Sequence, residues 1–158
     1  NVDPTAEELA EIAINTARAA ELFGTTPRVA MLSYSDFGEH HRHPQVRKVR
    51  KAIELVRQAW PELEIDGEMQ ADTAINADKR TDNFPFSVLT GTANTLIFPD
   101  LTAGNIAYKL LVHLTDAEAL GPLVMGIDGP VSVIPVGASV NDIVNITTWT
   151  ACRALDRS

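Results

Sequence analysis

The stretch LTGTANTLIFPDLTAGNIAYK, residues 89–109, decides the fold class of this chain. Its apolar run at 95–98 is typical of a buried strand, and the periodic residues from 103 onward predict a helix. A polar loop containing Gly104 and Asn105 joins the two. Such a strand–loop–helix connection is a common anion site in α/β proteins, but ordinary turns favour the same residues. Both interpretations are open on this pattern.

Outside this stretch, predicted helices alternate with predicted strands along the whole chain. Asp3 and Pro4 are typical of a helix start, and Ser139 followed by Asp142 has the spacing of a capping box. This alternation predicts an α/β protein with a largely parallel sheet. We expect helices at 4–23, 45–60, 103–115 and 139–155, strands at 28–34, 63–69, 95–98, 120–127 and 131–135, a short helix or turn at 70–74, and a loop at 78–85.

Length, charge and composition limit the possible functions. A chain of 158 residues suits one domain, and its formal net charge of −8 argues against general nucleic-acid binding. No apolar run approaches the ~20 residues of a membrane span, and no secretory signal is present. The single cysteine, Cys152, favours a reducing compartment, so we expect a cytoplasmic protein. The abrupt start inside a helix pattern suggests a fragment of a larger polypeptide.

Positive charge is concentrated in one amphipathic segment. The cations are either the solvated face of the helix or an anion-binding patch on an acidic protein. Three neighbouring histidines match no zinc-binding spacing, so no metal site is expected. The cations are Arg42, Arg47, Lys48, Arg50 and Lys51, and the histidines are His40, His41 and His43.

An acidic group follows at Asp66, Glu68 and Asp72. Paired carboxylates are able to carry out acid–base chemistry or to hold magnesium. Solvated acidic residues are the commoner explanation for such a group, and both explanations are open.

Five stretches together resemble the phosphate acetyltransferase family, and they occur in that family's order. They are RVAMLSYS at 28–35, DGEMQAD at 66–72, GTANTLIFPDLTAGNIAYKLL at 91–111, LGPLVMGI at 120–127 and SVNDIVN at 139–145. The resemblance implies a three-layer α/β fold of the isocitrate/isopropylmalate-dehydrogenase type. Residues 1–158 would then be the C-terminal part of a phosphotransacetylase-like domain: its second α/β domain and the segment that returns to the first.

The resemblance also implies changes at the catalytic positions. Active members carry Ser-Arg-Gly-x-Ser before the last helix, where this chain has Pro135, Val136, Gly137, Ala138 and Ser139. A further family arginine corresponds to His113, and only the aspartate is retained, as Asp142. We therefore expect no catalytic residue at this site. The expected ligand-binding residues are Ser33, Tyr34, Ser35, Asn94, Asn105, Lys109, Ser139 and Asp142.

The sequences HPQ-x-x-KVRKA at 43–52 and DGEMQ at 66–70 look most like one branch of the family. In that branch a non-catalytic domain of hybrid NADP-dependent malic enzymes senses acetyl-CoA. The leading expectation is such a regulatory domain. Its implied partners are acetyl-CoA as effector, a second copy of the chain and a malic-enzyme domain. NADP and Mg/Mn would serve conversion of malate to pyruvate and CO2 in that upstream domain.

Two alternatives remain. One is an active phosphate acetyltransferase with a rearranged site. The other is an oligomerisation module that binds no ligand.

Overall fold

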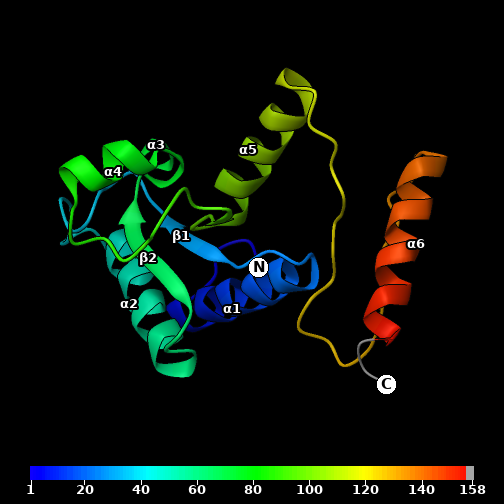
Figure 1. Cartoon of the computed structure of the whole chain (residues 1–158), viewed down its shortest axis with the longest axis horizontal. Helices are drawn as coiled ribbons and strands as arrows, with labels where there is room; N and C mark the ends of the chain where they lie inside the picture. Colours follow the sequence, from blue (N-terminus) through cyan, green and yellow to red (C-terminus); the bar gives the residue numbers. More distant parts are fainter. Residues whose placement is uncertain (156–158) are drawn as a thin grey trace. The chain divides into compact units, whose positions relative to one another are not determined.

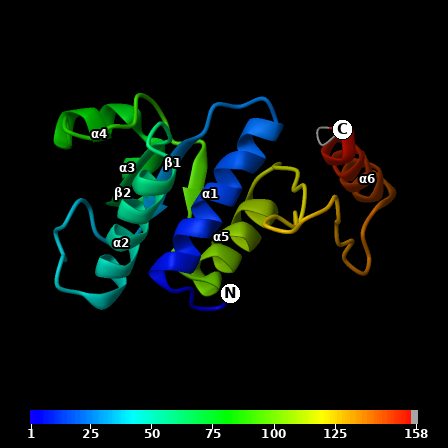
Figure 2. The same ribbon diagram turned by 90° about the horizontal axis from the view of Figure 1, so that it is seen from below.

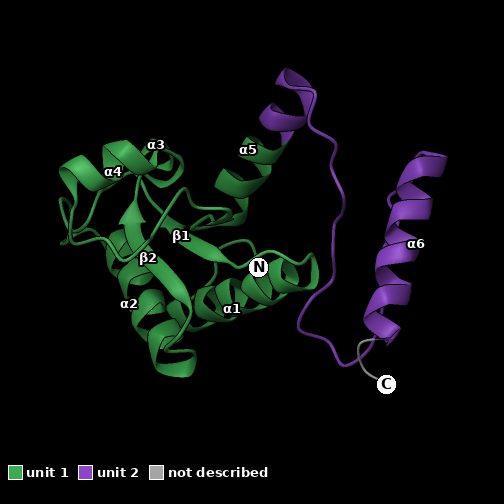
Figure 3. Ribbon diagram, viewed as in Figure 1, with its two compact units in different colours: residues 1–108 green, residues 109–158 purple. Residues whose placement is uncertain are grey.

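The computed structural model describes residues 1–155, which contain α-helices and a small parallel sheet (Figure 1). The chain divides into two compact units, Asn1–Tyr108 and Lys109–Ser158 (Figure 3). Unit 1 contains α1 (Ala6–Leu22), β1 (Arg28–Leu32), α2 (Pro44–Ala59), β2 (Glu64–Met69), α3 (Ala71–Ile75), α4 (Ala77–Asn83), β3 (Thr95–Ile97) and the start of α5 (Leu101–Leu114). Unit 2 contains the end of α5 and α6 (Val140–Leu155).

The sheet of unit 1 has the strand order β2-β1-β3, with both pairs parallel. Alternate residues of β1 therefore face opposite sides of the sheet. Val29 and Met31 join a core with α1 and α2, which pack against each other (Figure 2). Ala30 and Leu32 join a second core with α3 and the segment before β3. Both faces of β1 are covered, which explains why its buried residues are apolar.

The start of the first helix differs from the prediction. Thr5, not Asp3, is the N-cap, and it forms a capping box with Glu8. Asp3 instead accepts a hydrogen bond from the ammonium group of Lys48, at 2.7 Å. An aspartate one residue before a proline is typical of a helix start, but a capping box satisfies two backbone donors and shifts the start by two residues.

The loop predicted at 78–85 is wrong, because residues 77–83 form helix α4. Asn76 caps this helix by accepting a hydrogen bond from the backbone N–H of Lys79, at 2.9 Å. Arg80 of this helix is only 1% exposed, and its guanidinium donates hydrogen bonds to backbone carbonyls of α3 and of residues 89 and 91. These bonds connect α4 to the neighbouring segments. A run of polar residues is typical of a loop, and these contacts of Asn76 and Arg80 were not evident from the sequence.

The strands predicted at 120–127 and 131–135 are also wrong. Within residues 1–155, neither run is a strand, and the one described sheet contains β2, β1 and β3 alone. A strand exists only where a neighbouring strand supplies a hydrogen-bond ladder, which apolar sequence does not guarantee. Helix α6 follows as predicted. None of the helices in the described part of the chain has both the length and the apolar character needed to cross a membrane.

Candidate functional site

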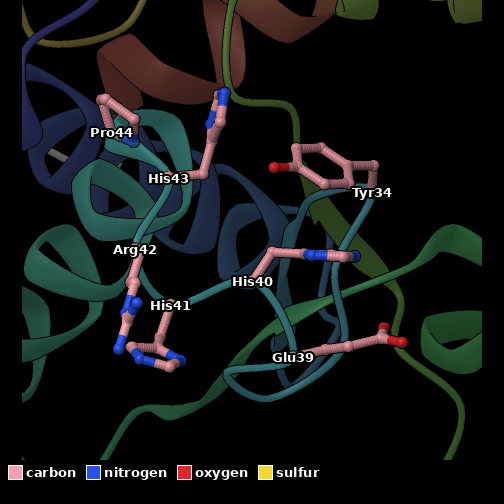
Figure 4. Close-up of a pocket in the computed structure, with 7 residues that line it drawn as sticks. All are labelled: Tyr34, Glu39, His40, His41, Arg42, His43 and Pro44. Atoms are coloured by element: carbon pink, nitrogen blue, oxygen red, sulfur yellow. The ribbon is translucent and has the colours of Figure 1, made fainter.

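The polar segment that follows β1, residues 33–43, forms the wall of a pocket at the carboxyl end of the sheet. In α/β proteins, ligands bind at the carboxyl ends of parallel strands. The pocket has a volume of ≈ 460 Å³ (Figure 4). It is lined by Tyr34, Glu39, His40, His41, Arg42, His43 and Pro44.

Aromatic and imidazole rings shape one side of this pocket. The ring centroid of Tyr34 lies 5.2 Å from that of His40 and 5.6 Å from that of His43, the latter in an edge-on arrangement (Figure 4). Tyr34 is 49% exposed, so its hydroxyl is accessible to a ligand. His43 is also the N-cap of α2, where its ring nitrogen accepts from the backbone N–H of Gln45. With Arg42, these groups provide hydrogen-bond donors and positive charge, which suit an anionic ligand.

A buried carboxylate, Glu68 of β2, lies beneath the 33–43 segment. One of its oxygens, Oε1, accepts from the Ser35 hydroxyl at 3.0 Å and from the backbone N–H of Gly38 at 2.6 Å. The backbone carbonyl of Glu68 accepts from the N–H of Phe37 at 2.7 Å. Three residues of the segment, Ser35, Phe37 and Gly38, therefore donate hydrogen bonds to Glu68.

Two further aspartates accept hydrogen bonds at the same end of the sheet. Asp36 accepts two hydrogen bonds from Gln70, one from the backbone N–H at 2.8 Å and one from the side chain at 2.9 Å. Asp100, which follows β3, accepts from the Gln45 side chain at 3.1 Å and from the backbone N–H of Ala103 at 2.8 Å. The loop after β1 is therefore bonded to the residue that follows β2, and the loop after β3 is bonded to α2 and α5.

The structure separates the predicted basic patch into different roles. Lys48, Lys51 and Arg50 pair with Asp3, Glu54 and Glu68 respectively. Arg42 lines the pocket at Tyr34. A second hollow, of ≈ 470 Å³, is lined by His41, Arg47, Arg50, Lys51 and Glu54. Three of the five cations are thus paired with carboxylates, and the anion-binding patch stays a prediction.

The acidic residues at 66–72 do not form one group. Asp66 is buried and pairs with Arg57 at 3.0 Å, whereas Glu68 faces the pocket segment. The exposed Asp72 pairs with Lys79 at 2.6 Å, and this hydrogen bond holds the pKa of the Asp72 carboxyl below its usual value. Within residues 1–155, no three His, Cys, Asp or Glu side chains are arranged to hold a metal ion.

The expected ligand-binding residues of unit 1 lie at both ends of the sheet. Ser33, Tyr34 and Ser35 follow β1, but Asn94 precedes β3 and so lies at the opposite, amino end of the parallel strands. The Asn94 amide is already bonded to the backbone of residues 26 and 28. Asn105 is exposed on α5, in the first turns of the helix.

Unit 2 carries the remaining expected residues. Ser139 and Asp142 line a hollow of ≈ 420 Å³ at the start of α6. Asp142 accepts from the hydroxyl and from the backbone N–H of Ser139, both at 2.8 Å, and these bonds lower the pKa of its carboxyl. Val136 is fully exposed in the preceding loop, which also contains Pro135. Lys109 and His113 lie one turn apart on α5.

Sequence reasoning named Glu68 only as a member of an acidic group and did not name Arg80. Both are charged side chains that the fold buries completely or nearly so. One signal was available for Glu68, since a glycine within a strand often marks a bulge, and Gly67 precedes it. The polar run around Arg80 contained no comparable signal.

The fold and the pocket define an α/β protein with a pocket of tyrosine, histidine and arginine side chains at the carboxyl end of its sheet. Sequence comparison gives the family: residues 1–151 match the family described as phosphate acetyl/butaryl transferase, and the chain belongs to it.

Relatives and solved structures agree with this assignment. The chain is 46% identical over 155 residues to the phosphate acetyltransferase of Thermoanaerobacterium thermosaccharolyticum, covering 98% of this chain and 47% of the relative. It is 45% identical over 154 residues to the Escherichia coli phosphate acetyltransferase, covering 98% of this chain and 21% of the relative.

The fold matches a phosphotransacetylase from Streptococcus pyogenes with a TM-score of 0.93 and 44% identity, over 99% of this chain and 47% of that chain. The EutD phosphotransacetylase from Staphylococcus aureus matches with a TM-score of 0.91 and 40% identity, over 98% of this chain and 48% of that chain. The chain therefore spans about half, or less, of the proteins that it matches.

These comparisons overturn the leading expectation from the sequence. The relatives matched over 98% of the chain are phosphate acetyltransferases, so the non-catalytic malic-enzyme domain is wrong, and so are the oxidoreductase and NADP expectations. The motifs that favoured it have a structural explanation. The KVRKA run lies on α2, where Val49 and Ala52 are core residues, and Met69 of DGEMQ is completely buried. Packing accounts for such residues and does not identify a branch of the family.

Proposed function

We propose that the chain is part of a phosphate acetyltransferase, which moves an acetyl group between coenzyme A and phosphate. The observation that carries the proposal is the agreement in both sequence and fold with a phosphotransacetylase, at 44% identity over 99% of the chain. The expectation that residues 1–158 are the C-terminal part of a larger catalytic domain belongs to this proposal.

In this reaction an oxygen of phosphate attacks the thioester carbonyl of acetyl-CoA. The carbon–sulfur bond breaks, acetyl phosphate forms, and the departing thiolate takes up a proton. The reaction needs cations for phosphate and a donor for the oxyanion that develops on the carbonyl oxygen. Pro135 and Val136 stand where the family resemblance places a serine and an arginine, and neither side chain supplies such a group.

The proposal assigns these tasks to the pocket after β1. Arg42 supplies the cation for phosphate, and Tyr34, His40 and His43 supply donors. Support comes from their placement around one pocket, where the Tyr34 ring lies close to both imidazoles. This is the rearranged site that an active enzyme with these substitutions requires.

The test uses the natural full-length protein with acetyl-CoA and phosphate, and it measures release of the CoA thiol. We expect release that depends on phosphate and is reversed by acetyl phosphate. Arg42→Ala should raise the KM for phosphate at least about tenfold, because a charge-assisted hydrogen bond is lost. Arg18→Ala removes an equal charge from an exposed position of α1 and should leave that KM unchanged. Acetyl-CoA binding without phosphate-dependent release would refute the proposed activity.

Self-association and a cytoplasmic location belong to the same proposal. Several apolar side chains of α5 are at least half exposed, which favours contact with further protein surface. They are Ile106 at 54%, Leu110 at 53%, Leu111 at 57% and Leu114 at 77%. Light scattering of the full-length protein should give a mass of at least two chains. A mass of one chain at all concentrations would contradict self-association without affecting the proposed activity.

A further inference from the structure

Glu68 is the extra residue in a register shift between the two central strands. Met31 of β1 pairs with Gly67, and Leu32 pairs with Met69, so Glu68 has no partner on β1. Bulges of this kind redirect a side chain and are common beside functional sites. Here the redirected side chain is a carboxylate that is 0% exposed.

The burial of this carboxylate is costly, and its partners do not fully compensate for it. Oε1 accepts two hydrogen bonds, but within residues 1–155 the buried Oε2 has no hydrogen-bond partner. Nε of Arg50 lies 4.0 Å from Oε2, beyond hydrogen-bond distance. A buried charge that is incompletely paired destabilises a fold unless it is needed for another reason.

In the part of the chain that the structure describes, the hydrogen-bond donors to the Glu68 carboxylate belong to the segment that forms the pocket wall. The Ser35 hydroxyl and the Gly38 N–H donate to the carboxylate, and the same Ser35 oxygen accepts from the backbone N–H of His40 at 3.1 Å. His40 in turn lies against the ring of Tyr34. A short chain of bonds thus connects a buried group on β2 to two residues of the pocket.

Arg50 fixes the segment from the outside. A Cβ atom added at Gly38 would lie 2.6 Å from Nη1 of Arg50, so the backbone passes directly against the guanidinium. The segment is therefore confined between the Glu68 carboxylate and the Arg50 side chain.

We propose that Glu68 is a positioning residue: its buried carboxylate holds residues 34–43 so that Tyr34, His40 and His43 keep the geometry of the pocket. The effect on substrate binding rests on the proposed acetyltransferase function. The effect on the order of the segment does not, and so the two are tested separately.

The chain offers a matched control on the same strand. Asp66 is also a buried carboxylate of β2, and it pairs with Arg57, which lies seven residues after Arg50 on α2. Its other partners are the hydroxyl of Ser87 and the N–H of Val88, both at 2.8 Å, and not the pocket segment. Asp66→Asn therefore removes an equivalent buried charge without touching the pocket wall.

The first experiment measures trypsin cleavage after Arg42, which lies within the segment. Glu68→Gln should accelerate this cleavage at least about tenfold, because hydrogen bonds to a charged acceptor become weaker neutral ones and the open state is populated more often. Ser35→Ala, a milder change, should accelerate it less, and Asp66→Asn should stay within about twofold of the natural protein. Equal cleavage rates at Arg42 for Glu68→Gln, Ser35→Ala and Asp66→Asn would overturn the proposal.

The second experiment measures steady-state kinetics of the full-length protein. Glu68→Gln should raise the KM for acetyl-CoA or phosphate by about tenfold or more while kcat changes less, since a displaced pocket weakens binding. Glu68→Asp, which keeps the charge, should recover part of the loss, and Asp66→Asn should leave KM unchanged. Matching KM changes in Glu68→Gln and Asp66→Asn would refute a role in positioning. If the natural protein releases no CoA thiol, the proposed function fails, and the cleavage rates still decide the role of Glu68.

Discussion

The side-chain oxygen of Asn94 accepts a hydrogen bond from the backbone N–H of Arg28 at 2.8 Å, across 66 residues of sequence. The Asn94 amide nitrogen donates to the carbonyl of Thr26 at 2.9 Å, and its backbone N–H donates to the carbonyl of Arg28 at 3.1 Å. These bonds connect the amino-terminal ends of β1 and β3, and they fix how the two strands lie side by side.

Asn94→Ala should therefore lower stability and leave substrate affinity unchanged. Losing the side-chain bonds to Arg28 and Thr26, together with the bond from the Thr95 hydroxyl, should cost about 2 kcal/mol in the free energy of unfolding, measured by urea denaturation. Asn94→Asp keeps the acceptor for Arg28 and loses the donor to Thr26, so it should cost less. A raised KM in either variant, at unchanged stability, would instead place Asn94 in the ligand site.

Arg80 should be among the residues most sensitive to substitution in unit 1. Its guanidinium donates to the carbonyls of Thr73 and Ala74 at 3.2 and 3.1 Å, to that of Leu89 at 3.3 Å, and to that of Gly91. Arg80→Met leaves four carbonyls without this donor and should cost roughly 3 kcal/mol or more in denaturation measurements. Arg80→Lys keeps the charge but not the planar fork, so an intermediate loss is expected. A loss below about 1 kcal/mol for Arg80→Met would show that water replaces the guanidinium.

Gly67 should not tolerate a side chain. Its φ is +134°, and an added Cβ would lie 2.6 Å from the carbonyl oxygen of Met31, a backbone atom of the central strand. Gly67→Ala should cost about 2–3 kcal/mol, measured by thermal unfolding.

Gly24→Ala is the control for the glycine conformation alone. Gly24 also has a positive φ, +72°, but an added Cβ would meet nothing within 4 Å. A cost of about 1 kcal/mol is expected there. Equal losses at both positions would mean that φ, and not the contact with Met31, limits Gly67.

Asp142 should stabilise α6 in a pH-dependent way. The hydrogen bonds from Ser139 lower the pKa of the Asp142 carboxyl in the folded state below its ordinary value of 3.8. Its stabilising effect is therefore present above the unfolded pKa and is lost as the pH falls through the folded pKa. Asp142→Asn should reduce helicity, measured by circular dichroism, near neutral pH and match the natural protein in strong acid. A difference that persists in strong acid would rule out the ionised carboxylate as its cause.

The helix boundaries show what local pattern is able to predict. The capping pair Ser139 and Asp142 is confirmed, and α2 and α5 lie within two residues of the prediction. These features depend on groups within one or two turns of each other, so the sequence alone records them. The prediction of strands at 120–127 and 131–135 was wrong because a strand needs a neighbouring strand as its partner, which local sequence does not show. The prediction of a loop at 78–85 was wrong because the polar composition of α4 did not show the buried contacts of Arg80.

The candidate site was likewise only partly predictable from the sequence. The composition of the residues after the first strand predicted a polar loop, and the family resemblance implied ligand-binding residues at 33–35, which stays a prediction. The burial of Glu68 and its bond to the Ser35 hydroxyl, a residue 33 positions earlier, were not predictable. Acidic residues in sequence are usually solvated, and only the packed sheet determines which of them lose contact with water.

By itself, the sequence determined the α/β alternation, the helix caps and the family resemblance, all of which depend on periodicity, short spacings and the order of motifs. Only the tertiary structure decided that Asn94 is a structural clamp, that Arg80 is buried and that Glu68 supports the pocket wall. The physical reason is that parallel strands bring together loops that are distant in sequence, and burial turns an ordinary polar side chain into one that must be satisfied by particular partners.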